Sequence, residues 1–373
     1  MSGSSPPGAT TLVVGYPRLL AREIAIRSAT TAADRTLVLV RPQDEAKAQI
    51  DLGGSPGVEL LSGDPTAIDL GLSGTDYDRL LGSVTHVHHV VPRLEKTRAR
   101  HAIVASTREL LELASAARVL QCAVHHSSVQ VFGDREGWLP EETVADAKHV
   151  RGAKDEILAL AENLVERELG TLPLAIARAG FVSGHSVTGE TERPSGIYLL
   201  ALLCLSAPSD LRLPFPGRGE WQLNLVPVDW VAAVAVQLAR APRAVHGRFH
   251  LVDPSPFSAR RVFELVAAAT TALRERRSGG GFLPAGFTRA LLRAPGLEPL
   301  VRSPRAFFEA WMRDVRFSSL HANAVLGPAA PVCPSFDTYV DQIVTHVAAS
   351  ARHGIEAPRR ERSREVEAED PLL

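Results

Sequence analysis

Two hydrophobic patterns alternate along the first half of the chain. Short β-branched, apolar runs typical of buried strands occur at residues 11–15, 36–41, 57–64, 83–91, 121–133 and 172–184. Apolar residues spaced as in amphipathic helices occupy residues 18–30, 102–117 and 148–165. Strands that alternate with helices predict an α/β fold, a doubly wound parallel sheet covered on both faces.

The pattern changes after residue 184, where apolar helices alternate with Pro-rich loops. We predict a disordered leader over residues 1–10, a doubly wound core over 11–184, a second region over 185–350 and a disordered charged tail over 351–373. The second region is expected to hold the remaining edge strands and a small, mostly helical cap. Its elements between 224 and 254 are expected to return to the core, and residues 255–317 to be helical with a break.

Composition and charge exclude several classes of protein. The chain has 373 residues, 45% of them hydrophobic, and a formal net charge of -1, which gives no sign of a nucleic-acid surface. The longest apolar run, residues 197–205, is about half of what a membrane-spanning helix needs. No signal peptide is recognisable and the three cysteines are scattered, so we expect a cytoplasmic protein without disulfides, nucleic-acid partner or membrane partner.

Several longer motifs then occur in a recognisable order. They are Gly63-Asp64, "DLGLS" (69–73), His89, "RAGFVSGHSVTGE" (178–190), "NLVPVDWV" (224–231) and "FHLVDP" (249–254). From about residue 11 to 347 the chain resembles extended short-chain dehydrogenases/reductases, closest to the thioester-reductase and fatty-acyl-reductase (male-sterility) branch. The resemblance implies a Rossmann-like, NAD(P)-binding core over 11–184 and a C-terminal substrate cap. It also implies NADPH-dependent reduction of an acyl thioester or carbonyl, with a small-molecule or carrier-bound acyl substrate.

The phosphate-binding loop departs from the family pattern. The family has three glycines there, because the backbone of this loop must approach the cofactor phosphates closely at a helix N-terminus. The matching positions are Gly15, Arg18 and Ala21. Arg18 leaves two alternatives open: its guanidinium pairs with the phosphates, or its side chain blocks them, which is the interpretation we favour.

Three further positions bear on the cofactor. Arg41 ends the second strand and favours NADP(H) through its 2′-phosphate, although a solvated Arg is an equal alternative. Asp64 matches the residue that the family places near the adenine, although a turn-forming Asp looks the same. Val91 and Pro92 stand where the family has small alanines, so we expect less room for the ribose and nicotinamide.

The catalytic residues of the family are only partly present. Ser128 matches the Ser that binds the substrate oxygen, and Lys154 matches the Lys, but Val150 stands at the Tyr position and has no proton to donate. A register shifted by one turn would place Lys154 at the Tyr position and Leu158 at the Lys position, and also lacks the pair. The supporting Asn is replaced by Ile103. His149 is expected to be a solvated or capping residue, since it lies off the helical face of Lys154.

Five histidines on two strands, His86, His88, His89, His125 and His126, could in principle gather around a metal ion. Alternate strand residues face opposite ways, so we expect no metal site.

Three functions therefore remain open. The first is an NADPH-dependent reductase of acyl thioesters or carbonyls with a degenerate, weak or inactive site. The second is a non-catalytic ligand-binding or scaffolding descendant. The third, less favoured, is an NAD-dependent epimerase or dehydratase, which shares the extended fold. Simultaneous losses at the glycine loop, the ribose wall, the Tyr and the Asn favour a degenerate site.

Overall fold

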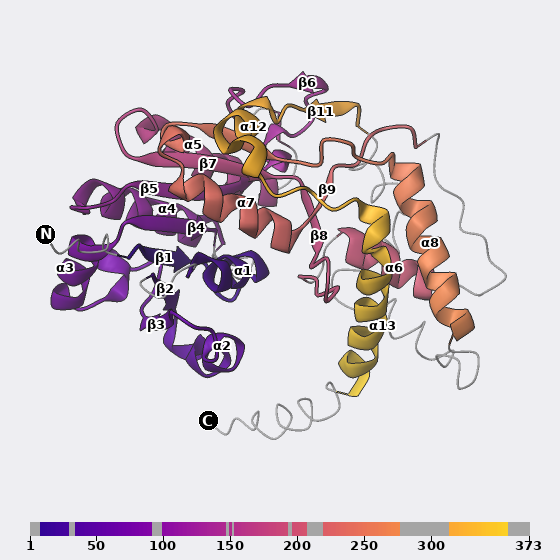
Figure 1. The fold of residues 1–373 in the computed structure, drawn as a ribbon, viewed down its shortest axis with the longest axis horizontal. Helices are drawn as coiled ribbons and strands as arrows, with labels where there is room; N and C mark the ends of the chain where they lie inside the picture. Colours follow the sequence, from indigo (N-terminus) through magenta and orange to yellow (C-terminus); the bar gives the residue numbers. More distant parts are fainter. Residues whose placement is uncertain are drawn as a thin grey trace, which may run out of the picture. The chain divides into compact units, whose positions relative to one another are not determined.

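A computed structural model of the chain describes residues 8–29, 34–91, 99–146, 149–150, 153–192, 196–206, 219–276 and 313–356. Its centre is a seven-stranded parallel sheet of order β10-β7-β5-β4-β1-β2-β3 (Figure 1). The strands of this sheet are β1 (Thr10–Val14), β2 (Arg35–Val40), β3 (Val58–Ser62), β4 (His86–Val90), β5 (Cys122–Ser128), β7 (Leu174–Ala179) and β10 (Arg248–Leu251). The order reverses between β1 and β4, which is the place where a doubly wound sheet binds its ligands.

Helices and smaller sheets complete the described elements. The helices are α1 (Leu19–Ser28), α2 (Glu45–Leu52), α3 (Gly74–Ser83), α4 (Ala99–Ala116), α5 (Ala153–Glu168), α6 (Gly196–Ser206), α7 (Val228–Arg240), α8 (Ala259–Arg276), α12 (Leu320–Leu326) and α13 (Val340–Glu356). Short 3-10 segments include η2 (Ile68–Gly71) and η3 (Val129–Phe132). Strands β6 (Gly137–Leu139) and β11 (Val315–Phe317) pair in parallel, and β8 (Phe181–Gly184) pairs with β9 (Leu225–Pro227).

Alternate strand residues fill two separate hydrophobic layers. Leu12 and Val87 face α4 and α5, where they pack with Leu110 and Val165. The intervening residues, such as Val13, face the opposite layer, which contains residues of α1, α2 and α7. Burial on both faces explains why these strands read as continuous apolar runs. The predicted α/β, doubly wound parallel fold is confirmed.

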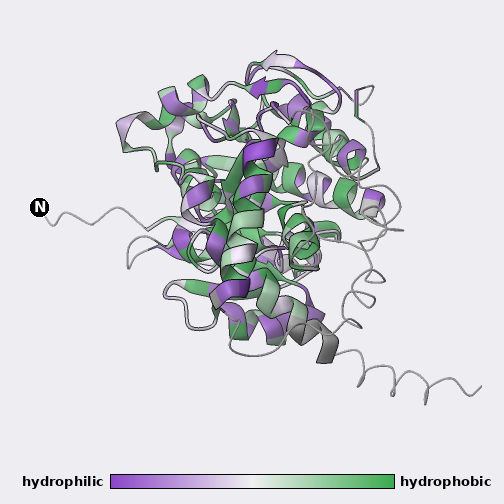
Figure 2. Cartoon of the chain, turned by 90° about the vertical axis from the view of Figure 1, so that its right-hand side faces the viewer, coloured by the Kyte–Doolittle hydropathy of each residue, from purple (hydrophilic) through white to green (hydrophobic). Residues whose placement is uncertain are grey.

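The chain divides into two units. The first comprises residues 1–182, 224–256 and 313–333, and the second comprises residues 183–223, 257–312 and 334–373. In the second unit α6, α8 and α13 pack against one another. Residues 340, 343, 344, 347 and 348 of α13 are buried, whereas residues 341, 342 and 345 are exposed, so α13 is amphipathic. Figure 2 shows that hydrophilic and hydrophobic residues alternate along the helices of the chain.

Some predicted boundaries are wrong. The strand predicted over 172–184 is broken at Gly180 into β7 and β8, and the predicted charged tail begins later, because α13 extends to Glu356. Thr10, predicted in the leader, is already in β1, where its amide donates to Thr85 Oγ1 at 3.0 Å. The three-residue strands β6 and β11 were not predicted because they are too short to show a period. Residues 277–312 and 357–373 lie outside the described residues.

Within the described ranges, no helix combines the length and hydrophobicity that crossing a membrane requires.

Candidate cofactor and active site

The loop after β1 brings the carboxyl ends of β1 and β4 into direct contact. Gly15 has φ of 116°, and a Cβ at this position would lie 2.1 Å from the carbonyl oxygen of Val90. Only glycine fits such an approach. Tyr16, which follows, is buried and donates its hydroxyl hydrogen to Asp51 Oδ2 at 2.8 Å. The first glycine of the family loop therefore keeps its structural role.

Arg18 connects this loop to the end of β4. It precedes α1, its amide donates to Gly15 O at 3.0 Å, and its guanidinium Nη1 donates to Val91 O at 3.2 Å. The side chain thus lies across the carboxyl ends of β1 and β4, where a pyrophosphate would meet the helix N-terminus. Ala21, the third loop position, is fully buried in the core beside Ile24.

Arg41 and Asp64 are both engaged within their own turns. Arg41 donates to Asp44 Oδ2 from Nε at 3.0 Å and from Nη2 at 2.8 Å. Asp64 Oδ1 accepts the amide and hydroxyl hydrogens of Thr66, both at 2.8 Å. These residues follow β2 and β3, at the same edge of the sheet as Gly15. A cofactor phosphate would have to compete with Asp44 for Arg41.

The turn after Asp64 is strained. Asp69, Leu70 and Gly71 have φ values of 54°, 57° and 68°, in the left-handed region that non-glycine residues rarely adopt. The turn is held because Leu70 is buried and its carbonyl accepts the Asp64 amide at 2.7 Å. The Glu109 carboxylate of α4 also accepts the Asp69 and Leu70 amides, although burial raises the pKa of Glu109 above its ordinary value.

Replacing the exposed Asp69 with glycine is expected to stabilise the fold. The Asp69→Gly change relieves the left-handed strain and should raise the free energy of unfolding by about 0.5–1 kcal/mol. Asp69→Ala, which keeps the Cβ but loses the tolerance of Asp for this region, should lower it. Urea denaturation of both variants measures the difference, and an unchanged or lower value for Asp69→Gly would show that the turn carries little strain.

Ser128 and Lys154 stand at the ends of the elements on which they were predicted. Ser128 is the last residue of β5, and its Oγ accepts the Gln130 amide hydrogen at 3.3 Å. Lys154 is the second residue of α5.

The helix predicted from residue 148 begins later, because α5 starts at Ala153. Val150 and His149 precede it, so the prediction that Val150 shares the helical face of Lys154 and that His149 does not is wrong. Val150 packs against the apolar cluster of Phe132 and Ala159. His149 Nδ1 lies 3.0 Å from Asp134 Oδ1, and its carbonyl accepts the Asp134 amide hydrogen at 2.8 Å. Neither residue is therefore positioned by helical periodicity.

Larger apolar side chains fill one position where the family has a small residue, Val91, and one where it has a polar residue, Ile103. Val91 and Ile103 are buried together with Ala161, in a cluster contributed by the end of β4, by α4 and by α5. Ile157 and Leu158 pack against the same cluster. The cluster gives these positions a role in the core of the first unit.

The tyrosines of the chain have other environments. Burial and the neighbouring Asp51 raise the pKa of Tyr16, which is the opposite of the change that a proton-donating Tyr requires. Burial also raises the pKa of Tyr77 on α3. Tyr198 is on α6, and the Tyr339 hydroxyl lies 3.0 Å from Ser183 Oγ, all within the second unit.

The histidines form two buried pairs on opposite faces of the sheet. On the α7 side, His88 Nδ1 lies 3.0 Å from His126 Nε2. On the α5 side, His89 Nδ1 lies 2.9 Å from His125 Nδ1, and His89 Nε2 lies 2.8 Å from Ser106 Oγ. Over the part of the chain that the structure describes, no three His, Cys, Asp or Glu side chains are grouped as a metal site would need.

The segment 224–231 has a packing role. Asn224 Nδ2 donates to Asp253 O at 3.0 Å, and the Asp253 amide donates to Asn224 Oδ1 at 2.8 Å. A Cβ at Gly180 would lie 2.8 Å from both Asn224 oxygens. Asn224 therefore has a structural role that needs no ligand.

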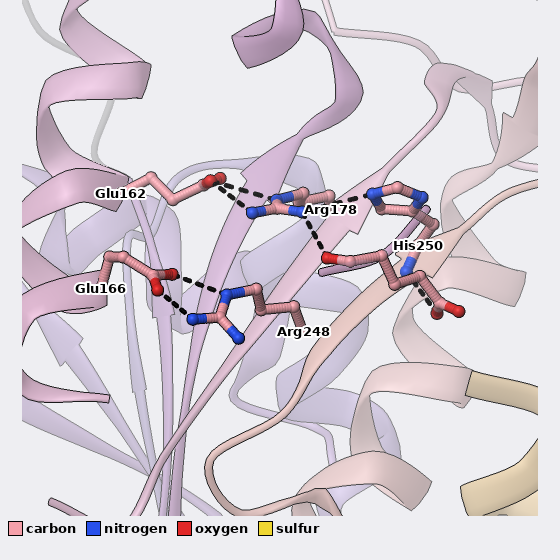
Figure 3. Close-up of polar contacts among 6 residues, drawn as sticks. Glu162, Glu166, Arg178, Arg248 and His250 are labelled. Carbon is pink, nitrogen blue, oxygen red and sulfur yellow. Dashed lines mark hydrogen bonds and ion pairs between the residues drawn. The ribbon is translucent and has the colours of Figure 1, made fainter. Parts of the chain in front are cut away.

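A buried polar network under α5 was missed at the sequence level. Arg178 of β7 is fully buried and donates to Glu162 Oε1 from Nε at 3.1 Å and from Nη2 at 2.8 Å (Figure 3). Its Nη1 donates to Glu141 O at 2.9 Å and lies 3.3 Å from His250 Nε2. One turn along α5, Glu166 pairs with Arg248 of β10. The signal that could have revealed the network is a lone Arg inside the apolar strand run "LAIARA".

This fold and the loop after β1 define a Rossmann-like domain of the NAD(P)-binding class. The family model described as male sterility protein, an NAD-binding family, matches residues 27–235, more than half of the chain. The chain therefore belongs to this family, the thioester-reductase branch of the extended short-chain dehydrogenases/reductases, and the predicted resemblance is confirmed.

Curated relatives are much longer than this chain. The chain is 30% identical over 216 residues to glycine betaine reductase ATRR of Emericella nidulans, a match that covers 56% of the chain and 16% of the relative. It is 29% identical over 213 residues to aldehyde reductase lnaA of Aspergillus flavus, which covers 50% of the chain and 20% of the relative. The chain thus spans no more than about a fifth of the length of these relatives.

Solved structures share the whole fold. The terminal R domain from the myxalamid PKS-NRPS biosynthetic pathway superposes with a TM-score of 0.72 at 22% identity, covering 93% of this chain and 92% of that one. A thiolation-reductase di-domain from an archaeal non-ribosomal peptide synthetase gives 0.66 at 14% identity, covering 91% and 75%. At these identities the likeness shows the fold alone.

Proposed function

We propose that this member of the NAD(P)-binding reductase family has lost tyrosine-dependent hydride transfer and acts as a binding module. The observation that carries the proposal is the environment of Val150, which has no proton to donate and packs into the Phe132 cluster. The apolar cluster of Val91 and Ile103 supports it, because restoring an Asn at position 103 would require repacking around α5. The ligand class we propose is an acyl group, free or carried as a thioester, by analogy with the reductases that share the fold.

The cofactor loop fits a dinucleotide only in part. Gly15 permits the close approach of β1 and β4, but the Arg18 guanidinium bonds to Val91 O where the pyrophosphate would lie. NADP(H) is the cofactor that Arg41 favours, and Arg41 is already paired with Asp44. We propose that Arg18 weakens dinucleotide binding, so no reaction step is assigned to the cofactor in this chain.

The Arg18→Gly variant tests the state of this loop. We expect it to bind NADPH at least 10-fold more tightly than the unaltered protein, a difference of about 1.4 kcal/mol in titration calorimetry. Arg79→Ala removes one positive charge from exposed α3 and should leave the affinity unchanged. Weaker binding by Arg18→Gly would mean that Arg18 pairs with the phosphates, and the blocking interpretation would fail.

Activity is tested separately, by following NADPH oxidation with acyl thioesters and aldehydes at saturating NADPH. The unaltered protein and Arg18→Gly are both expected to be inactive, because neither supplies the acid. Turnover by either protein would refute the loss of hydride transfer, whatever the binding result.

A further inference from the structure

Three buried polar atoms on one face of the sheet have no hydrogen-bond partner. They are His125 Nε2, Ser127 Oγ and Glu162 Oε2. The relative exposures of these residues are 1%, 8% and 1%. Burying a polar group without a hydrogen-bond partner is costly, so three unpartnered atoms on one face call for an explanation.

The three atoms belong to neighbouring elements on the same face of the sheet. His125 and Ser127 alternate along β5, so both point to the face that α4 and α5 cover. Ser127 is the direct register partner of Arg178 on β7. Nε and Nη2 of Arg178 both donate to the same oxygen of Glu162, Oε1, so Glu162 Oε2 is left over.

The hydrogen-bonding needs of these atoms are complementary to one small neutral molecule. If His125 Nδ1 donates to His89 Nδ1, then His89 Nε2 donates to Ser106 Oγ, and His125 Nε2 remains an acceptor. Glu162 Oε2 is also an acceptor, whereas the Ser127 hydroxyl can donate. In the opposite tautomer His125 Nε2 is a donor, and a molecule that both donates and accepts still satisfies all three.

We propose that one internal water molecule is bound between His125, Ser127 and Glu162. It accepts the Ser127 hydroxyl hydrogen and donates to Glu162 Oε2 and His125 Nε2. A cation is disfavoured because Arg178 already neutralises Glu162, and an anion is disfavoured by the Glu162 carboxylate. Buried water of this kind makes about three hydrogen bonds to otherwise unsatisfied groups.

The water completes a continuous polar chain under α4 and α5. This polar chain of hydrogen bonds runs from Ser106 through His89 and His125 to the water, and from there to Glu162 and Arg178. Figure 3 shows the far end, where Arg178 meets His250 of β10. The polar chain thus connects four neighbouring strands, β4, β5, β7 and β10, to α5.

A crystal structure of the full chain, at a resolution that shows ordered water, tests the proposal. We expect an isolated density peak within about 2.6–3.2 Å of all three atoms. Ser127→Ala should keep a peak with two partners, and Ser106→Ala, which alters the opposite end of the polar chain, should leave the peak unchanged. An empty site, or a Ser127 hydroxyl bonded directly to Glu162 Oε2, would overturn the proposal.

Unfolding in solution provides a second measurement. Ser127→Ala leaves room for the water, whereas Ser127→Val fills its space with a methyl group and leaves Glu162 Oε2 and His125 Nε2 without a partner. We expect a lower unfolding midpoint for Ser127→Val than for Ser127→Ala. The reverse order would mean that the space is dry and that the proposal is wrong.

Discussion

Acidification from pH 7 to pH 5 is expected to destabilise the folded chain strongly. Burial lowers the pKa of His88 to about 3 and that of His125 to about 4, and it holds the pKa of His89 and His126 well below the ordinary value. In the unfolded chain these imidazoles titrate near pH 6.5, so between the two pKa values the unfolded state binds more protons. Stability is therefore present above about pH 6.5 and is lost as the pH falls below it.

The direction and steepness follow from the linkage relation. Each imidazole that stays neutral in the folded state contributes about 1.4 kcal/mol per pH unit below the unfolded pKa, so the free energy of unfolding should fall steeply between about pH 6.5 and pH 5. Raised pKa values of Glu141 and Asp253, both caused first by burial, act in the opposite direction and offset part of this loss. Urea denaturation at pH 8, 7, 6 and 5 measures the slope.

Matched variants identify the source of the slope. The double variant His88→Gln/His126→Gln should reduce proton uptake on unfolding by about two protons near pH 5. His101→Gln, on the exposed side of α4, should leave the slope unchanged. A pH-independent free energy of unfolding between pH 7 and pH 5 would contradict the assignment of these histidines as neutral buried pairs.

The strands of the first unit could be predicted because their signal is local. β1 and β2 are largely buried, so nearly every residue is apolar or β-branched and the run shows directly in the sequence. The start of α5 could not be predicted in the same way. Residues 153–168 carry the helical period, but the residues before them include His149, which is held by Asp134 and Gly133 from a distant loop. Periodicity does not report such a contact.

The candidate site was predicted as a set of positions but not as a set of contacts. The sequence indicates that Arg18 replaces a glycine, yet only the structure shows its guanidinium on Val91 O. Likewise it indicates that Val91 and Ile103 replace small or polar residues, while their joint burial against α5 is a tertiary fact. Arg178 and Glu162, 16 residues apart, were missed because an ion pair between a strand and a helix has no sequence period.

These contacts bear on the proposed loss of hydride transfer. A single lost tyrosine could be regained by one substitution, but here the positions around it pack into continuous apolar clusters. Close packing makes a polar replacement at Val91 or Ile103 costly, because each would bury a group without a partner. The proposed loss of hydride transfer is thus stabilised by the core itself, while the fold retains the polar network under α5.

Removing Arg178 is expected to have the largest effect of any single substitution in that network. The Arg178→Met change leaves the Glu162 carboxylate buried without a counter-charge, and it also removes a donor from Glu141 O. Breaking a buried pair from one side costs about 3–5 kcal/mol, whereas replacing both partners by apolar residues is often neutral. We therefore expect the urea midpoint to fall sharply in Arg178→Met and to recover largely in Arg178→Met/Glu162→Leu.

The neighbouring pair provides the control, because it has the same chemistry one helical turn away. The Arg248 and Glu166 side chains are 24% and 16% exposed, so water can solvate the carboxylate that Arg248→Met leaves behind. That variant should lose clearly less stability than Arg178→Met. Equal losses in the two variants would show that burial does not determine the cost. A double variant no more stable than Arg178→Met would show that the Glu141 and His250 contacts, and not the unpaired charge, dominate the effect.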